Sequence, residues 1–370
     1  MVSERSGNIW LVSSNRWNSA ITEYALSSVR SIQAQGYHCL FSPLAGSPAE
    51  KRAQKQPFKT ISLPTFNLTS LRDMTRIAKD FKPDVVISFG GPETVLANLA
   101  GRAYHQGRII RFRGQDLQAA VVGRLRERVS SLLFRSLVVP GAALAGKMRT
   151  VLPGKSVHLL PLGCDEEVFR WLQGPVIDER DLLVVGRLDP VKGHARCFEI
   201  YAHFKRFWEQ QNFGRRPKLK IIGESANITP SDLHCSAAGV GLVPESDYFI
   251  VNQKVSAIAD HMRQALLGII PSTGSEFICR VAQEFLLVGT PIAVSGVGSL
   301  SDCLFQGAGF SYQGISSENA GRMLATLAKK YQGENDWARQ SRAESALKNY
   351  SLSAMGLSWS RLLDELYESS

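Results

Sequence analysis

The chain has 370 residues, a net charge of +10, 44% hydrophobic residues and 21% charged residues. Domains usually run about 100–200 residues, so we expect two, and a disordered chain or a peptide-sized module is excluded. No segment has the ~20 uninterrupted apolar residues that a membrane-spanning helix needs. The six cysteines form no closely spaced pair, which predicts a reducing, cytoplasmic setting without a disulfide framework.

The positive charge lies in the front half of the chain. Residues 1–175 carry 23 Lys and Arg against 12 Asp and Glu, a net charge of +11. This asymmetry predicts an anionic partner, such as a membrane surface or a phosphorylated glycan or lipid, although a basic surface that only aids solubility explains it equally well. No nucleic-acid motif accompanies the charge, so we expect no nucleic-acid partner. Residues 124–134 fit a basic helix lying on a membrane and an ordinary helix with its apolar residues inward equally well.

In chain order, the first half alternates short apolar runs with amphipathic stretches. This β-α alternation predicts a parallel sheet covered by helices on both faces. A Pro/Gly/Lys-rich loop is expected at Pro43–Phe58. The expected strands are Ile9–Ser13, His38–Ser42, Asp84–Phe89, Arg108–Phe112, Val138–Val139 and Val157–Leu160, and the expected helices are Ile21–Gln35, Leu71–Phe81, Glu93–Tyr104 and Ala142–Arg149.

Turn residues and three acids between Pro161 and Phe169 interrupt the pattern, and a second β-α series follows. We therefore predict an α/β protein with two doubly wound, Rossmann-like domains, 1–170 and 171–350, and a C-terminal helix in 351–370 that packs on either domain, the N-terminal one included. The expected strands of the second series are Asp181–Val185, Lys218–Ile222, Tyr248–Val251, Gly268–Pro271 and Pro291–Ser295, and the expected helices are Ala195–Gln211, Lys254–Ala265, Val281–Leu287 and two after Asn319 and Asn335.

The strongest chemical signal is the stretch 184–194, where a β-branched strand end leads into a loop just before a helix. The loop contains Gly186, Arg187, Lys192 and Gly193. Glycines let the backbone approach a ligand, cations neutralise it, and the helix N-terminus offers unpaired N–H groups. This combination suits a diphosphate, while a turn with two surface cations is the plainer interpretation.

A second signal is a pair of glutamates around a helix start. Glu276 precedes the helix and Glu284 lies two turns later. Carboxylates accept hydrogen bonds from neighbouring hydroxyls, as ribose and sugar rings present them. Alternatively, Glu276 is a charge favoured by the helix dipole and Glu284 a surface residue.

Several motifs agree in order and spacing: P-x-G-x-D-x-x-x-F at 161–169, G-R-L-x-x-x-K-G at 186–193, the glutamates at 276 and 284, and G-T-P at 289–291. In this order the chain resembles the retaining nucleotide-sugar glycosyltransferases of family four, which have the GT-B fold. The resemblance implies two Rossmann-like domains facing a central cleft, the first binding the acceptor and the second the nucleotide sugar.

The resemblance also implies which residues hold the donor. Arg187 and Lys192 would hold the leaving diphosphate, Glu276 would lie by the hydroxyls of the donor sugar, and Glu284 would take the ribose hydroxyls. The backbone amides of Phe277 and Ile278 would contact sugar or phosphate. The donor-binding set implied is Gly186, Arg187, Lys192, Glu276, Phe277, Ile278 and Glu284, and the catalytic set is Arg187, Lys192 and Glu276.

The reaction implied is transfer, with retention, of a hexosyl or related sugar (EC 2.4) to a glycan or lipid-linked acceptor in envelope polysaccharide synthesis. It needs no metal and no cofactor beyond the donor substrate, and it would occur in the cytoplasm, peripherally at the inner face of the membrane. The alternatives are a non-catalytic, degenerate binding protein and a nucleotide-sugar epimerase or phosphorylase on the same fold.

The chain departs from the family pattern in the parts expected to meet the acceptor. The first loop carries Arg16, Trp17 and Asn18 where glycines are usual, and Arg113 lies where similar proteins have His-Gly. Arg16, Asn18 and Arg113 are therefore the candidate acceptor-binding residues, although Arg113 has Asp116 as an alternative partner.

Two further departures concern the donor side and the first helices. Phe277 and Cys279 replace glycines, with Arg280 as a candidate replacement cation. Glu93 is interpreted as a charge at a helix N-terminus.

Overall fold

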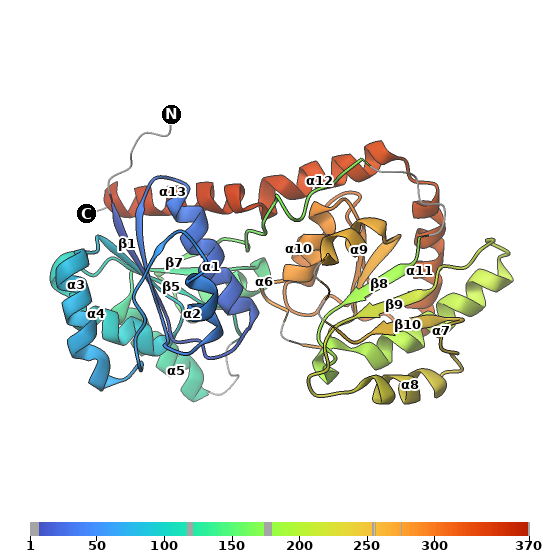
Figure 1. The fold of residues 1–370 in the computed structure, drawn as a ribbon, viewed down its shortest axis with the longest axis horizontal. Helices are drawn as coiled ribbons and strands as arrows, with labels where there is room; N and C mark the ends of the chain where they lie inside the picture. The colour runs from blue at the N-terminus through green and yellow to red at the C-terminus, as the bar shows by residue number, and fades with distance from the viewer. Residues whose placement is uncertain are drawn as a thin grey trace. The chain divides into compact units, whose positions relative to one another are not determined.

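The computed structural model describes residues 7–116, 121–173, 180–253, 255, 257–274 and 276–368. Contacts divide the chain into two compact units. Unit 1 comprises Met1–Cys164 and Asn349–Ser370, and unit 2 comprises Asp165–Lys348. The two sequence boundaries were expected at 170 and 350. Figure 1 shows the helices and strands of each unit.

Unit 1 is built on a seven-stranded sheet in which every pairing is parallel. The strand order is β3-β2-β1-β4-β5-β6-β7, so the direction of winding reverses between β1 and β4. The strands are β1 (Asn8–Ser13), β2 (His38–Pro43), β3 (Lys59–Thr60), β4 (Val85–Ser88), β5 (Ile109–Phe112), β6 (Ser136–Val139) and β7 (Ser156–Leu159).

Helices connect these strands, as the β-α alternation predicted. The loop expected at Pro43–Phe58 was wrong in one respect, because it contains helix α2, which Ser47 caps by accepting the Glu50 N–H and which begins at Pro48. The helices of unit 1 are α1 (Ala20–Gln33), α2 (Pro48–Ala53), α3 (Leu71–Phe81), α4 (Gly91–His105), α5 (Val121–Ser130), α6 (Ala142–Val151) and α13 (Leu352–Glu368), with short 3₁₀ turns η1 (Leu68–Ser70) and η2 (Ser131–Leu133).

The last helix, α13, packs on α1 within unit 1. Gly356 lies so close to α1 that a Cβ there would be 2.8 Å from the Ser31 carbonyl oxygen. The Tyr37 hydroxyl also lies 3.1 Å from an Asp364 carboxylate oxygen. Unit 1 therefore contains residues from both ends of the sequence, and α13 covers part of α1.

Unit 2 repeats the architecture with a six-stranded parallel sheet in the order β10-β9-β8-β11-β12-β13. Helix α8 and strand β13 were not expected from the sequence. The strands are β8 (Leu182–Val185), β9 (Leu219–Ile222), β10 (Tyr248–Val251), β11 (Leu267–Ile270), β12 (Ile292–Val294) and β13 (Gly309–Ser311). The helices and 3₁₀ turns are η3 (Pro190–Lys192), α7 (His194–Gln210), α8 (Pro230–Ala238), α9 (Ile258–Gln264), α10 (Arg280–Leu287), η4 (Leu300–Cys303), α11 (Ser317–Gln332) and α12 (Asp336–Tyr350).

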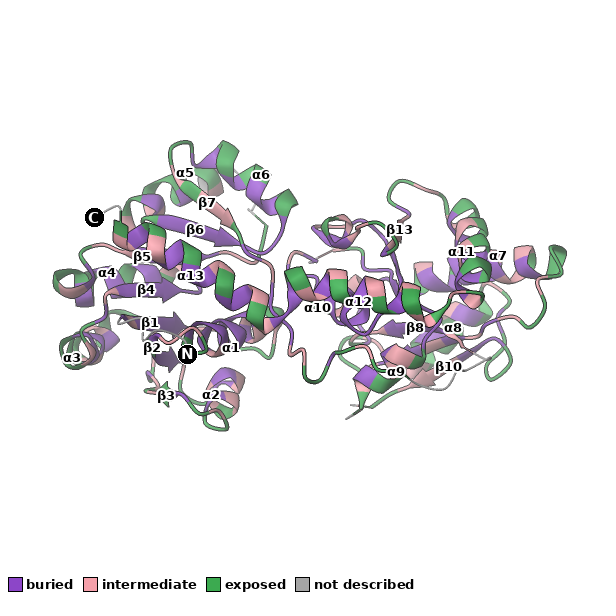
Figure 2. Cartoon of the chain, turned by 90° about the horizontal axis from the view of Figure 1, so that it is seen from above, coloured by how far each residue is buried: buried purple, intermediate pink, exposed green. Residues whose placement is uncertain are grey.

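The core of unit 2 fixes the sheet and its first helix in place. One face of α7 carries Phe198, Tyr201, Phe204 and Trp208, all fully or almost fully buried. Gly321 lets α11 approach α7, because a Cβ there would lie 2.6 Å from the Ile200 carbonyl oxygen. Figure 2 shows the strands of both units as mostly buried. This packing makes the carboxyl ends of the strands a rigid base for the loops that follow them.

Among the described residues, no helix is both long enough and apolar enough to cross a bilayer.

Candidate functional site

Two loops meet at the carboxyl edge of the unit 2 sheet, where β8 and β11 are neighbours and the strand order reverses. Open α/β sheets bind ligands at such a switch point. Lys192 in the loop after β8 places Nζ 2.5 Å from Oε1 of Glu276 in the loop after β11. The Ser272 hydroxyl donates to the same oxygen at 2.7 Å. The two motifs that the sequence singled out are thus side by side.

Glycines make this close approach possible. Gly193 has φ of +69°, and a Cβ there would lie 2.0 Å from the Pro271 carbonyl oxygen. Gly223 at the end of β9 lies equally close to the loop, since its Cβ would be 1.8 Å from the Gly186 carbonyl oxygen. Neither space admits a side chain, so the loop after β8 is held against both neighbouring strand ends.

Asp189 shapes the loop from inside. Its carboxylate accepts the Val191 N–H at 3.0 Å and the Asn227 side-chain amide at 2.6 Å. The Val191 N–H, followed by Asn227, lowers the pKa of Asp189, so the carboxylate is ionised at neutral pH. Residue types and motifs did not single out Asp189, although an acid one residue before a proline-led turn is a recognisable cap.

Arg187 and His194, near the two ends of this loop, differ in exposure. The Arg187 side chain is exposed, and its guanidinium makes no hydrogen bond or ion pair with any described residue. His194, at the start of α7, is 1% exposed, with Nε2 3.2 Å from the Arg187 carbonyl oxygen. Burial lowers the pKa of His194, so the imidazole is neutral and Nε2–H is the donor to that carbonyl. A buried neutral imidazole therefore supports the backbone of a residue with an exposed cation.

The Glu276 loop is anchored through its own backbone. The Ser299 N–H donates to the Glu276 carbonyl at 2.7 Å, and Gly298, with φ of +65°, leaves no room for a Cβ beside it. Cys279, also with positive φ, ends the loop at the start of α10. Phe277 and Ile278, which follow Glu276 directly in this loop, are half-buried and buried.

Glu284 lies on α10 and is 4% exposed. Its Oε1 accepts a hydrogen bond from Arg280 Nε at 2.6 Å, an ion pair across one helical turn. Arg280, expected as a replacement cation near the donor, is thus the partner of Glu284 in this structure.

The acceptor candidates of unit 1 fall into two settings. Arg16 and Asn18 are exposed in the loop between β1 and α1, next to Trp17, which is 75% exposed. Arg113, by contrast, uses its guanidinium within the protein: it pairs with Glu127, and it donates to the carbonyls of Gln115 and Asp116.

The Glu127 carboxylate forms ion pairs with two arginines. Both terminal nitrogens of Arg111, at the end of β5, lie 3.1 Å from its carboxylate oxygens, and Arg113 binds the same carboxylate. The alternative pairing of Arg113 with the Asp116 side chain does not occur, because that carboxylate binds Lys147 at 2.6 Å. The pair of cations on one buried anion leaves a net positive charge near the end of β5.

Glu93 lies where the strand order of the unit 1 sheet reverses. It is 1% exposed, and Oε1 accepts the Ser14 N–H at 2.6 Å. Its other oxygen is buried and has no hydrogen-bond partner among the described residues. Burial raises the pKa of this carboxyl. The interpretation as a simple charge at the helix start missed the link to the first loop, which no sequence pattern indicates.

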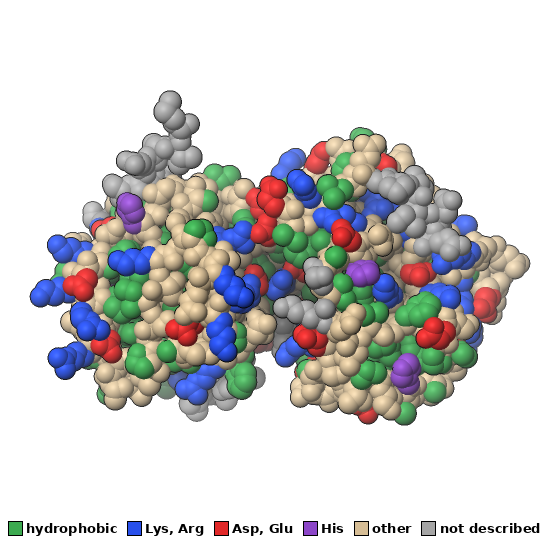
Figure 3. Space-filling model, viewed as in Figure 1, with side chains coloured by type: hydrophobic (Ala, Val, Ile, Leu, Met, Phe, Trp, Pro, Cys, Tyr) green, Lys and Arg blue, Asp and Glu red, His purple; other side chains and the backbone are tan. Residues whose placement is uncertain are grey.

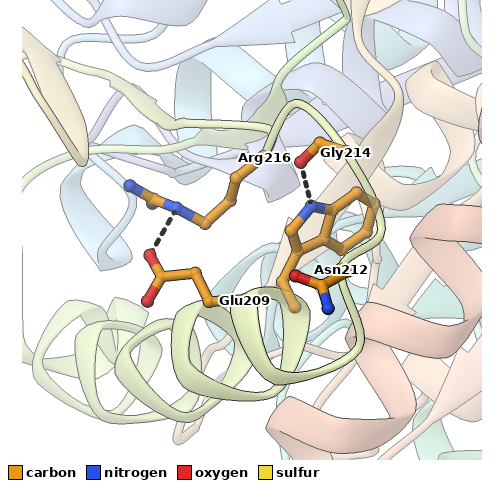
Figure 4. Close-up of a pocket in the computed structure, with 5 residues that line it drawn as sticks. Glu209, Asn212, Gly214 and Arg216 are labelled. Atoms are coloured by element: carbon orange, nitrogen blue, oxygen red, sulfur yellow. Dashed lines mark hydrogen bonds and ion pairs between the residues drawn. The ribbon is translucent and has the colours of Figure 1, made fainter.

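A separate cavity of about 350 Å³ lies beyond the C-terminal end of α7 and before β9, away from the loops after β8 and β11. Figure 4 shows Glu209, Asn212, Gly214 and Arg216 around it. Trp208 Nε1–H donates to the Gly214 carbonyl, and Arg216 binds Asp247 and Tyr201. Arg216 also pairs with Glu209 at 3.5 Å, so the charged side chains around the cavity already have protein partners, and we assign it no ligand.

Within the described ranges, no group of three or more His, Cys, Asp or Glu side chains is arranged to hold a metal ion.

No protein-family model matches the chain, and no curated protein matches it. Solved structures do. A glycosyltransferase from Rickettsia africae has a TM-score of 0.79 at 13% identity, covering 99% of this chain and 100% of that one. The Anabaena protein HepE (Alr3699) in complex with UDP has a TM-score of 0.75 at 14% identity, covering 97% and 100%.

The lipopolysaccharide outer core galactosyltransferase WaaB has a TM-score of 0.71 at 12% identity, covering 97% of this chain and 99% of its own. These likenesses extend over nearly the full length of both chains. They show that the chain has the GT-B fold, as the sequence predicted.

Proposed function

We propose that this protein is a retaining glycosyltransferase that takes its sugar from a nucleotide-diphosphate donor bound at the carboxyl edge of the unit 2 sheet. The observation that carries the proposal is the Lys192–Glu276 pair at 2.5 Å. It unites a cation suited to a diphosphate with a carboxylate suited to sugar hydroxyls, at the start of α7. The UDP and UDP-glucose complexes of HepE, which has a similar fold, support a nucleotide sugar as the donor.

In this proposal each residue of the two loops has a distinct task. Lys192 and the exposed Arg187 hold the diphosphate beside the N–H groups at the start of α7, while Glu276 orients the sugar. Gly186, Phe277 and Ile278 offer backbone atoms to the donor, and Glu284, shared with Arg280, takes the ribose hydroxyls.

The chemical step needs mainly charge stabilisation. As the bond between the anomeric carbon and the diphosphate breaks, negative charge grows on the phosphate oxygen. The acceptor oxygen forms the new bond on the same face, and its proton passes to the departing diphosphate. Two cations and a helix N-terminus aimed at that oxygen stabilise the developing charge, and removing one such group commonly costs ~10²–10³ in rate.

The acceptor in this proposal is a glycan or lipid-linked molecule of envelope polysaccharide synthesis, handled at the inner face of the membrane. The +11 charge of residues 1–175 supports an anionic acceptor or surface. Arg16 and Asn18 are exposed, and in this proposal they contact the acceptor. Arg113 would take part by exchanging one of its protein partners for the acceptor.

A thermal-shift panel tests the donor site directly. Wild type, Lys192→Ala and a control, Lys330→Ala, are heated with UDP, GDP, ADP, CMP and their sugars. Ligand binding to the folded state raises the melting temperature by mass action. We expect one diphosphate to stabilise wild type and Lys330→Ala, whose lysine is exposed on α11, and not Lys192→Ala.

Two outcomes count against the proposal. Equal stabilisation of Lys192→Ala places the nucleotide elsewhere. If no nucleotide stabilises wild type, the result favours the alternative, a non-catalytic binding protein with the same fold.

A further inference from the structure

Three aliphatic side chains of helix α5 and the turn η2 are exposed to solvent. Leu125 and Val129 of α5 and Leu132 of η2 are 63%, 60% and 79% exposed. Their spacing of four and then three residues places them on one side of the helix. The sequence left open whether this segment packs its apolar residues inward or lies on a membrane. These three side chains do not pack inward.

The side of α5 that faces the sheet is polar instead. Glu127 is 8% exposed and holds Arg111 with two hydrogen bonds of 3.1 Å. The Ser130 hydroxyl, one turn later, accepts from Arg111 at 2.8 Å. Polar contacts therefore fasten α5 to the end of β5 while aliphatic side chains face water. This is the reverse of the usual surface helix, whose apolar face covers the core.

Arginines flank the exposed apolar side chains. At 100° per residue, Arg124 and Arg128 lie on one side of them and Arg126 on the other. All three are exposed, and Figure 2 shows the exposed segments of α5 next to α6. We call these three arginines together with Leu125, Val129 and Leu132 the α5 surface.

The segment that carries the α5 surface is mostly positive, and the acid just before it, Asp116, is paired with Lys147. Residues 117–164 contain seven Lys and Arg and a single acid, Glu127. That acid is buried and already paired with two arginines. On the visible face of unit 1, Figure 3 shows Lys and Arg side chains interspersed with Asp and Glu side chains. No acidic side chain of this segment is thus left to neutralise the α5 surface.

A helix in contact with η2 also carries an exposed aliphatic side chain. The Asn98 side-chain amide of α4 donates to the Leu133 carbonyl of η2 at 3.1 Å, so α4 lies beside η2. Leu99, the next residue of α4, is 60% exposed.

We propose that the α5 surface docks on an anionic lipid bilayer. The aliphatic side chains insert at the level of the headgroups, and the arginines bind lipid phosphates. Charge complementarity selects this partner: a nucleic acid would engage the arginines and leave the leucines in water, and a second copy of this surface would oppose like charges. The inference deepens the membrane contact of the proposed function, and it needs neither donor nor acceptor to be tested.

Vesicle sedimentation of the full chain tests the docking. We expect wild type to bind vesicles of phosphatidylcholine mixed with phosphatidylglycerol, to release them as salt rises, and to ignore vesicles of phosphatidylcholine alone. Each arginine near an anionic surface contributes about fivefold in binding, so Arg124→Gln/Arg126→Gln/Arg128→Gln should bind ~10²-fold more weakly. Leu125→Ser/Val129→Ser/Leu132→Ser should bind these vesicles at least about tenfold more weakly than wild type.

The matched control removes two apolar side chains of similar exposure elsewhere. Val243 and Leu357 are 55% and 52% exposed, and Val243→Ser/Leu357→Ser should bind anionic vesicles like wild type. Circular dichroism and the nucleotide thermal shift verify that every variant is folded. A protein that binds no nucleotide but still binds these vesicles contradicts the proposed function and leaves the docking in place.

Three results would overturn the docking. The first is no vesicle binding by wild type, or equal binding to neutral and anionic vesicles. The second is vesicle binding that survives both triple variants. The third is that the triple variants alter only duplex DNA binding or oligomeric state, which would assign the α5 surface to a nucleic acid or to a second copy of the chain.

Discussion

Gly193 ties together the two loops that meet at the carboxyl edge of unit 2. Its Cβ would lie 2.0 Å from the Pro271 carbonyl oxygen, and its φ is +69°. We expect Gly193→Ala to lower the stability of unit 2 and to abolish nucleotide stabilisation. The left-handed backbone costs about 1–2 kcal/mol for alanine, and the clash adds about 1–3 kcal/mol.

Gly241 provides the matched control for that change. Its φ is +76°, but nothing lies within 4 Å of its would-be Cβ. Gly241→Ala should therefore lose only the stability that the left-handed backbone costs, and it should retain nucleotide binding. Denaturant unfolding and the thermal shift of both variants measure the difference, and equal losses would show that the contact with Pro271 is unimportant.

Glu93 gives unit 1 a pH dependence of known sign. Burial raises the pKa of this carboxyl, so its contribution to stability is full below the usual glutamate value of about 4.3 and is lost as pH rises through the folded-state value. We expect the melting temperature of Glu93→Gln to rise relative to that of wild type as pH increases from acid to neutral. Thermal melts across that range measure the gap.

An exposed carboxylate on α12 serves as the reference for that series. Glu344→Gln removes an acid that is exposed. Its melting temperature should follow wild type at every pH. A gap between wild type and Glu93→Gln that is constant with pH would mean that Glu93 titrates at its ordinary value.

Residue types and spacing were enough to single out Lys192 and Glu276 as candidates, because each lies in a short local motif; their roles toward a donor stay predictions. Asp189 and His194 were missed because their roles come from contacts: one caps a turn and binds Asn227, the other supports a carbonyl from a buried position. Arg113 shows the converse. Its charge suggested a ligand, and the fold also gives it a protein partner, Glu127.

At the scale of elements, α13 and α1 meet through a glycine. A Cβ on Gly356 would lie 2.8 Å from the Ser31 carbonyl oxygen and 2.9 Å from the Gln35 amide nitrogen. Gly356→Val should therefore separate the two helices and destabilise unit 1 by about 1–3 kcal/mol more than Ser353→Val, which puts the same residue at an exposed position of α13. Urea unfolding compares them, and equal midpoints would contradict this packing.

Most elements were predictable because apolar periodicity switches cleanly between strand and helix. The exceptions are short or polar. Strand β13 has three residues, too few for a pattern, while α8 follows the capping pair Thr229 and Asp232, a signal that was available in the sequence. Helix α5 was ambiguous for a physical reason, since its described aliphatic side chains, Leu125 and Val129, are exposed to solvent.

At the scale of the whole molecule, alternation and motif order were enough to predict two Rossmann-like units and the GT-B fold. They did not determine which unit receives the last helix, because α13 is amphipathic and would cover either sheet. Contacts such as Tyr37 with Asp364 decide this, and such contacts join residues too far apart in the chain for any local pattern to report.

The return of α13 to unit 1 has a consequence for synthesis. The chain of unit 1 stops at Cys164 and resumes at Asn349, so all of unit 2 emerges from the ribosome before the helix that covers α1. Domains of nascent proteins usually mature in the order in which they are translated. Here the order is inverted: the unit that begins first must wait, with the surface around Ser31 uncovered, until the unit that begins second has been made.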